Sequence, residues 1–138
     1  MITVRELMKT HTQALTMGDS LQTALDRLDV YQTQHLPVVD DARQVLGSVS
    51  EQGCTQRAWK EINLHNTDLH HITVADLLDA NIMAVQDTEP VTGLLVSRCV
   101  ETHPWLPVTD SQGSLIGTLN RIDVIQAMLD GILSADPR

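Results

Sequence analysis

The sequence holds few arrangements of residues that could carry out chemistry. It contains no GxSxG, GxxxxGK[ST] or HExxH motif, and no glycine-rich loop of the kind that cradles phosphate. The adjacent carboxylates Asp40 and Asp41 fall in a short polar stretch between two apolar runs, where aspartate is a turn former. The pattern therefore predicts no catalytic residues and a protein that is not an enzyme.

The histidines are the next residues whose spacing could matter. His70 and His71 are adjacent, and His65 lies five residues before His70. Histidine pairs that bind a metal from one helix are usually four residues apart, and no cysteine or carboxylate pattern accompanies these three. We therefore predict no metal site and interpret the polar segment 63–71 as a linker.

Asp123 is the carboxylate that the sequence places most distinctively. It directly precedes the apolar residues Val124 and Ile125. The segment before it runs from Gly117 through Thr118 and Leu119 to Asn120. Aspartate in front of an apolar helical stretch is a good helix N-cap, because its oxygen accepts a backbone N–H of the first turn. A purely structural role as a cap is thus one interpretation of Asp123.

Composition limits the surroundings in which these residues act. The chain has 138 residues, 42% of them hydrophobic, which suits a compact unit with its own core. No apolar run is long enough to span a membrane, the start does not resemble a secretory signal, and Cys54 and Cys99 lack metal or disulfide spacing. These features predict a cytoplasmic protein without a membrane segment.

Charge and aromatic content argue against nucleic acid as a partner. The net charge is −9, and a surface of this sign repels the phosphate backbone of a duplex. Aromatic residues make up 2% of the chain, so platforms for stacking bases are scarce. A single nucleotide is still compatible with the charge, because a local basic pair can dominate inside a pocket.

An internal repeat is the main organising feature. Shifting the chain by 70 residues aligns its two halves without a gap: Ile2-Thr3-Val4 falls on Ile72-Thr73-Val74, and the segment 36–40 (LPVVD) falls on 106–110 (LPVTD). We predict repeat 1 over residues 1–62, the linker over 63–71, repeat 2 over 72–133 and a C-terminal tail over 134–138.

Each copy follows the same predicted order of elements. An opening helical turn and a short extended piece come first, then a helix, two strands that form a hairpin, and a last helix. Ser20 caps the first helix of copy one, whose stripe includes Leu25, and Pro90 begins that of copy two, whose stripe includes Leu94. The predicted strands and closing helices cover 36–39, 45–50 and 53–62 in copy one, and 106–109, 115–120 and 123–133 in copy two.

This tandem β-α-β-β-α order, with its two LPV(V/T)D segments each followed by a glycine, resembles the CBS domain family. The resemblance covers nearly the whole chain and is more complete in copy two. It implies an α+β fold in which two repeats pack sheet to sheet as one pseudo-two-fold module, and modules of this kind commonly dimerise. One copy of this size buries little surface alone, so its sheet needs the twin as cover.

The resemblance also implies a ligand site. In nucleotide-binding members an aspartate at the position of Asp123 accepts hydrogen bonds from ribose hydroxyls, and a carboxylate can accept two such donors at once. Arg121 and His35 are candidate phosphate partners, although Arg121 is equally well explained as a solvated surface charge. The complete predicted site comprises Asp123, Asn120, Thr118, Arg121, Gln13, Thr33, Gln34 and His35.

A second cleft is expected to be degenerate. Gly53 occupies the position of copy one that matches Asp123, so the ribose anchor is missing there. Trp105 matches His35 and is a candidate plug. The residues assigned to this cleft are Met83, His103, Pro104, Ser48 and Ser50.

The resemblance thus implies a regulatory, energy-sensing module that requires no cofactor. It would bind AMP, ADP or ATP (S-adenosylmethionine being a weaker candidate) and pass the signal to an unknown effector protein as a homodimer. The alternative is an interaction protein that binds no nucleotide and acts as a scaffold through dimerisation.

Overall fold

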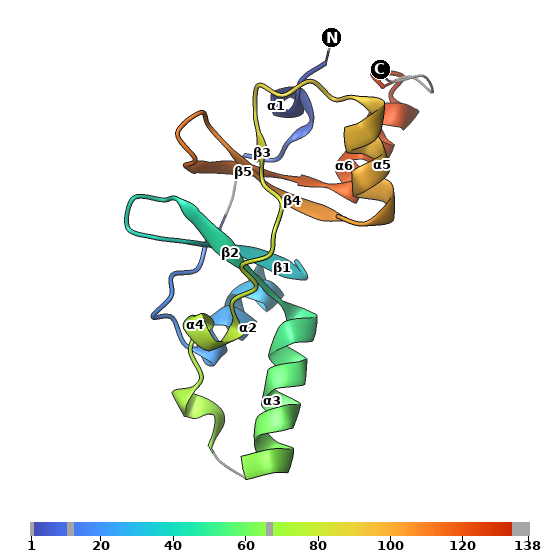
Figure 1. Ribbon diagram of the computed structural model, residues 1–138. Coiled ribbons are helices and arrows are strands. Elements are labelled where there is room, and N and C mark those ends of the chain that lie inside the picture. The colour runs from blue at the N-terminus through green and yellow to red at the C-terminus, as the bar shows by residue number, and fades with distance from the viewer. Residues whose placement is uncertain (1, 11–12, 66–67, 134–138) are drawn as a thin grey trace. The chain divides into compact units, whose positions relative to one another are not determined.

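The computed structural model describes residues 2–10, 13–65 and 68–133 and shows a mixed α+β fold with two small sheets (Figure 1). This confirms the predicted fold class. The elements are α1 (Val4–Leu7), α2 (Leu21–Val30), β1 (His35–Val39), β2 (Val45–Ser50), α3 (Glu51–His65), the 3₁₀ helix η1 (Leu69–His71), α4 (Val74–Leu77), β3 (Val85–Gln86), α5 (Gly93–Glu101), β4 (Trp105–Thr109), β5 (Leu115–Asn120) and α6 (Arg121–Leu129).

The chain forms two compact units. The first unit consists of Gln13–Ile82, and the second unit combines Met1–Thr12 with Met83–Arg138. Each unit therefore takes its opening helical turn from the other sequence copy. The predicted repeats 1–62 and 72–133 follow sequence similarity. The compact units differ from them because each opening segment belongs to the unit that holds the hairpin of the other repeat.

The first unit is built on an antiparallel hairpin. Strands β1 and β2 pair from His35 opposite Ser50 to Val39 opposite Val45, and Leu15 adds a parallel bridge to Val38. Side chains that are aliphatic or small fill the space between this sheet and its helices. They are Leu15, Leu21, Ala24, Leu28, Leu36, Val38, Val49, Cys54, Ile72 and Val74.

The second unit repeats this plan with one regular strand more. β4 and β5 pair antiparallel, and β3 pairs parallel to β4 through Val85 and Gln86. The core is again aliphatic, as expected for a chain without phenylalanine. Its buried members are Val4, Val85, Val91, Leu95, Val96, Cys99, Leu106, Val108, Leu119, Val124, Ala127 and Leu133.

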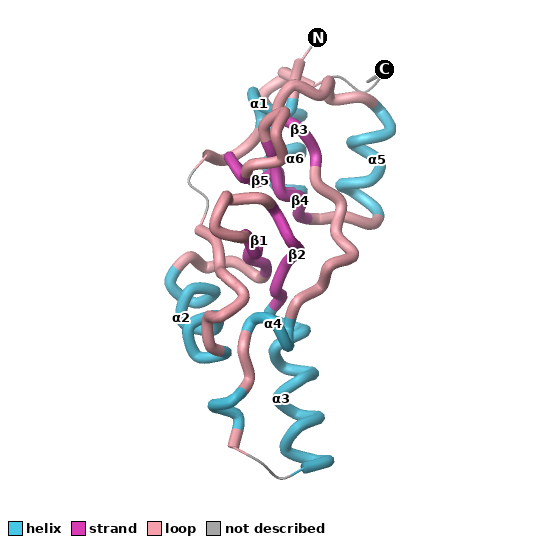
Figure 2. Tube along the Cα trace, turned by 60° about the vertical axis from the view of Figure 1, so that its left-hand side comes forward, coloured by secondary structure: helices cyan, strands magenta, loops and turns pink. Residues whose placement is uncertain are grey.

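The opening segments are held in their units by matching backbone hydrogen bonds. In the second unit, Lys9 and Thr118 exchange two N–H···O bonds of 2.8 and 2.9 Å. In the first unit, Asp79 and Ser48 exchange two bonds of 2.9 Å in the same way. Figure 2 shows α1 in the unit that contains β3, β4 and β5, although these strands lie far along the chain from α1.

A glycine makes each close approach possible. A Cβ on Gly117 would lie 2.5 Å from the carbonyl oxygen of Lys9, and one on Gly47 would lie 2.4 Å from that of Asp79. Both glycines come from the repeated motif. The sequence repeat therefore preserves them because backbone must pass directly over backbone at these two positions.

Helix α5 differs from the prediction for copy two. The helix begins at Gly93 rather than at Pro90, and its N-cap is Thr92, whose hydroxyl accepts the Leu95 N–H. Leu94 is consequently 63% exposed and Val96 is buried in its place. The prediction for α2 was better, since Ser20 caps it as expected, although Leu25 is 41% exposed.

The end of α3 also extends beyond the predicted limit. The helix continues to His65 rather than stopping at Ile62, and residues 69–71 form η1, which is capped by Asp68. The positions 66–67 of the predicted linker and the predicted tail 134–138 lie outside the described residues. Within the described part of the chain, no helix combines the length and apolar character needed to cross a membrane.

Candidate functional site

The carboxylate of Asp123 is held at the start of α6. Asn120 is the N-cap of this helix, and Asp123 is the third helical residue, whose Oδ2 accepts the backbone N–H of Asn120 at 2.8 Å. The prediction that Asp123 itself caps the helix was wrong. The chain instead forms a capping box with the helix beginning at Arg121, because Asn120 is the better-placed cap at the end of β5.

The second oxygen of Asp123 faces a lysine. Oδ1 lies 3.5 Å from Nζ of Lys9, and the Asp123 side chain is only 9% exposed whereas that of Lys9 is 61% exposed. Both carboxylate oxygens are therefore engaged inside the second unit. A hydroxyl donor that approached Oδ1 would compete with a flexible, well-hydrated ammonium group rather than with a buried partner.

The residues predicted to accompany Asp123 lie close to it in the chain and in the unit. Thr118 is half-buried and uses its backbone to bind Lys9. Arg121 donates Nε–H to the carbonyl oxygen of Cys99 at 3.0 Å, so part of its guanidinium is directed to the end of α5. This contact was not foreseen by either interpretation of Arg121.

The other half of the predicted site belongs to the first unit. Gln13 is exposed, and Thr33, Gln34 and His35 lead into β1. The hydroxyl of Thr33 donates to the His35 carbonyl oxygen at 3.0 Å, which fixes the turn before the strand. Burial lowers the pKa of His35, so the imidazole is neutral over more of the pH range than an exposed histidine. A neutral ring is a weaker phosphate partner than a charged one.

Gln34 and His35 line a cavity of about 380 Å³ in the first unit. Its other walls come from Ser50 and from the first turns of α3, including Gln52 and Gln56. The structure thus places Ser50, which was assigned to the degenerate cleft, beside two residues that were assigned to the main site. The glutamines of α3 were missed, because a polar residue on an exposed helical face carries no distinctive sequence signal.

The residues of the predicted degenerate cleft are mostly occupied by local contacts. Ser50, which corresponds to Asn120 in the repeat, accepts the N–H of Gly53 at 2.9 Å, and no carboxylate stands at the Gly53 position that matches Asp123. Ser48 is buried and bound to Asp79 through its backbone. In the second unit, Met83 accepts from Arg98, His103 contacts the Thr102 hydroxyl, and Pro104 accepts the Arg121 N–H.

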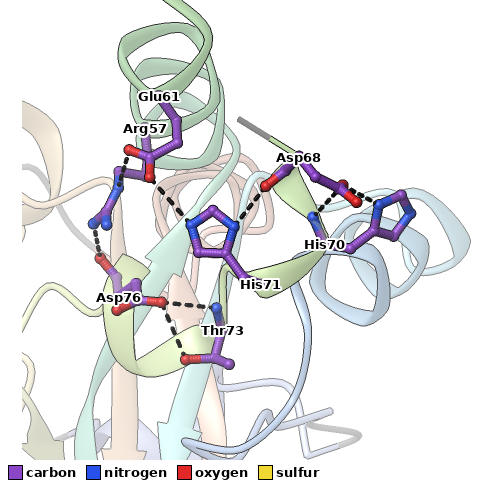
Figure 3. A network of polar contacts seen from close by, with 7 residues as sticks. All are labelled: Arg57, Glu61, Asp68, His70, His71, Thr73 and Asp76. Carbon is purple, nitrogen blue, oxygen red and sulfur yellow. Dashed lines mark hydrogen bonds and ion pairs between the residues drawn. The ribbon is translucent and has the colours of Figure 1, made fainter. Parts of the chain in front are cut away.

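His70 and His71 take part in a polar network with Asp68 and Glu61 (Figure 3). The side chain of His71, the last residue of η1, connects η1 to α3: its Nε2 lies 3.1 Å from Glu61 Oε1, and its Nδ1 lies 2.5 Å from the Asp68 carbonyl oxygen. His70 contacts the Asp68 carboxylate, whose pKa is lowered mainly by the backbone N–H of His70. The described residues contain no group of three or more His, Cys, Asp or Glu that could hold a metal ion.

Lys9 is the neighbour of Asp123 that sequence reasoning missed. It lies 114 positions before Asp123, and no local pattern links the two residues. The only available signal was the repeat itself, since the opening segment of one copy packs against the hairpin of the other. The exchange of opening segments was not anticipated.

Comparison with known proteins places these features in context. The family model described as the CBS domain matches residues 4–56. The chain is 24% identical to a CBS domain-containing protein of Dictyostelium discoideum over 144 residues, which covers 99% of this chain and 98% of that protein.

Solved structures show the same architecture. CBSX2 in complex with AMP is 26% identical, covers 96% of this chain and 100% of its own, and superposes with a TM-score of 0.81. The CBS domain pair of MJ0100, solved with 5′-methylthioadenosine and S-adenosyl-L-methionine, is 17% identical and has a TM-score of 0.74, with 96% of this chain and 98% of that chain covered. The second of these similarities bears on the fold alone.

Proposed function

Because the chain is a tandem CBS-domain protein, we propose that it is a regulatory module that binds an adenosyl ligand, AMP, ADP or ATP, and passes the signal to a partner protein. The observation that carries this proposal is the similarity, along 96% of the chain, to CBSX2, whose structure contains AMP. CBS pairs are generally regulatory rather than catalytic, and the sequence has no catalytic motif. The module therefore acts by changing its own arrangement when a ligand binds.

Asp123 is the proposed ribose anchor. Its Oδ2 is fixed by the Asn120 N–H, which orients the carboxylate, and its Oδ1 faces only the exposed ammonium of Lys9. Two vicinal hydroxyls would find a preorganised acceptor at this oxygen pair. Asn120, Thr118 and Arg121 lie around it, and Gln13, Thr33, Gln34 and His35 are proposed to complete the site.

The alternative is a scaffold that binds no nucleotide. The observation in its favour is the engagement of Asp123, which is 9% exposed and already has partners for both oxygens. In this case the carboxylate serves the capping box alone. The two functions are separated by direct measurement of nucleotide binding.

We expect one nucleotide per chain. Gly53 stands in copy one at the position of Asp123, and the nearby Ser50 hydroxyl, at the position of Asn120, accepts fewer hydrogen bonds than a carboxylate. Isothermal titration calorimetry with AMP, ADP and ATP should therefore return a stoichiometry of one for the best ligand. Two equivalent sites per chain would contradict the proposed asymmetry, and absence of binding for all three nucleotides would favour the scaffold.

We also expect a homodimer. Helix α6 exposes Ile122, Ile125, Met128 and Leu129, whereas Val124 is buried in the core. This is more apolar surface than a single helix usually leaves in water. Light scattering at micromolar concentration should give twice the chain mass, and Leu129→Glu should shift the mass towards the monomer without unfolding the chain. A monomeric wild type would contradict this prediction.

A further inference from the structure

The first unit has a groove between the end of α2 and the start of α3, which we call the α2–α3 groove. It has a volume of about 400 Å³ and an apolar side formed by Leu25 and Leu28. Its polar side comes from the carboxylates of Asp29 and Glu51 and the amides of Gln32 and Gln34. A cavity of this size can hold one long side chain.

The two carboxylates give the groove its charge. Asp29 and Glu51 are both exposed, and neither takes part in an ion pair with another described residue. The C-terminal end of α2, where Asp29 lies, adds the partial negative charge of a helix end. The groove therefore favours a cation whose remainder is apolar enough to cover Leu25.

The second unit shows which group fills the matching place. Glu51 and Arg121 correspond in the repeat, and their backbones are placed alike: Glu51 N–H donates to the Gln34 oxygen at 2.9 Å, and Arg121 N–H to the Pro104 oxygen at 2.8 Å. From this position the half-buried Arg121 reaches the carbonyl oxygen of Cys99 at the end of α5, at 3.0 Å.

The first unit carries acidic residues at the two corresponding positions. Asp29 corresponds to Cys99, and Glu51 replaces the arginine. The Asp29 carbonyl oxygen is bound at 2.7 Å by the side-chain amide of Gln32, so the carboxylates remain as the acceptors. The chain thus supplies its own guanidinium in one unit and presents two carboxylates in the other.

We infer that the α2–α3 groove binds an arginine side chain of a partner protein, in the place that Arg121 occupies in the second unit. The guanidinium carries five N–H donors in a planar fork, which suits bidentate contact with a carboxylate better than the compact ammonium of lysine, and both Asp29 and Glu51 line the groove. Its aliphatic stem would cover Leu25 and Leu28. This inference concerns the partner; because Thr33 and Gln34 of the groove also belong to the proposed nucleotide site, it is tested without nucleotide.

The test uses the full chain, labelled with ¹⁵N and free of nucleotide, and the blocked peptide acetyl-Leu-Arg-Leu-amide as the probe. The control peptide carries citrulline, which has nearly the same shape as arginine but no charge. The arginine peptide should shift the backbone amides of Leu25, Leu28 and Glu51 in a saturable manner. Equal shifts with the citrulline peptide would overturn the inference.

Three variants distinguish specific binding in the groove from attraction of the peptide to the acidic surface in general. Glu51→Gln should weaken the arginine peptide about tenfold, as loss of one charged acceptor does. Asp26→Asn, on the exposed side of α2 outside the groove, removes the same charge and should change nothing. Glu51→Arg should fill the groove from within, as Arg121 does, and abolish peptide binding.

The outcomes are distinct. Equal weakening by Glu51→Gln and Asp26→Asn would show attraction to net negative charge only and would overturn the inference, as would unchanged binding by Glu51→Arg. Circular dichroism verifies that each variant is folded. Because no nucleotide is present, failure here leaves the proposed adenosyl function to be decided by its own titrations.

Discussion

Replacing Gly117 with alanine is expected to destabilise the protein by about 2–4 kcal/mol, the sum of a typical overpacking penalty and two weakened backbone hydrogen bonds. The new Cβ would lie 2.5 Å from the Lys9 carbonyl oxygen and 3.1 Å from Met8 Sδ. The nearest atom belongs to backbone, so no side-chain rotation can relieve the contact. The opening segment must move away from β5, which breaks the two bonds between Lys9 and Thr118.

Urea denaturation followed by circular dichroism measures this loss directly. Gly18→Ala is the matched control, since a Cβ at Gly18 meets nothing within 4 Å, and this substitution should be neutral or slightly stabilising. Gly47→Ala should behave like Gly117→Ala, because its Cβ would lie 2.4 Å from the Asp79 carbonyl oxygen. If Gly117→Ala were as stable as Gly18→Ala, the exchange of opening segments would not be as the structure has it.

Much of the architecture could be predicted from the sequence because it rests on local signals. The strands 45–50 and 115–120 were predicted with the limits that the structure shows, since apolar runs bounded by polar turns determine them. The Ser20 cap was likewise predicted from a hydroxyl before an apolar helical stripe. Such features depend on a few neighbouring residues and do not require knowledge of how distant segments pack.

Non-local features were not predictable in this way. The helical turns at Val4 and Val74 were predicted, but nothing local shows that each packs with the hairpin of the other copy. Helix α5 was misplaced by about one turn because Pro90 is a frequent first helical residue, whereas the Thr92 hydroxyl was the stronger cap. The Lys9–Asp123 pair was missed because it forms only when the opening segment of copy one packs in the second unit, which no local pattern indicates.

Asp123 illustrates both limits. The resemblance to the CBS family singled out Asp123 as a ligand residue, and the local sequence favoured it as the helix cap, whereas the N-cap is Asn120. A residue that completes a capping box presents its carboxylate differently from one that is itself the cap. The structure therefore changes what each substitution at this position should do.

Asp123→Asn is expected to lower nucleotide affinity about ten- to hundredfold, the range that corresponds to losing hydrogen bonds to a charged acceptor. The amide oxygen of asparagine can still accept the Asn120 N–H, so the capping box is kept. The lost ion pair with Lys9 involves a largely exposed ammonium and contributes less than about 1 kcal/mol to stability. The melting temperature should therefore change little.

Lys9→Ala and Asp123→Ala complete the experiment. Lys9→Ala removes the same ion pair but keeps the carboxylate, so it should leave nucleotide affinity unchanged or raise it by freeing Oδ1. Asp123→Ala should lose nucleotide binding and also about 0.5–1.5 kcal/mol of stability, because the Asn120 N–H loses its acceptor. Calorimetry with the best nucleotide and thermal melting of all four proteins provide the comparison. If Asp123→Asn binds as tightly as wild type, Asp123 serves the capping box only, and a wild type that binds no nucleotide would instead support the scaffold function.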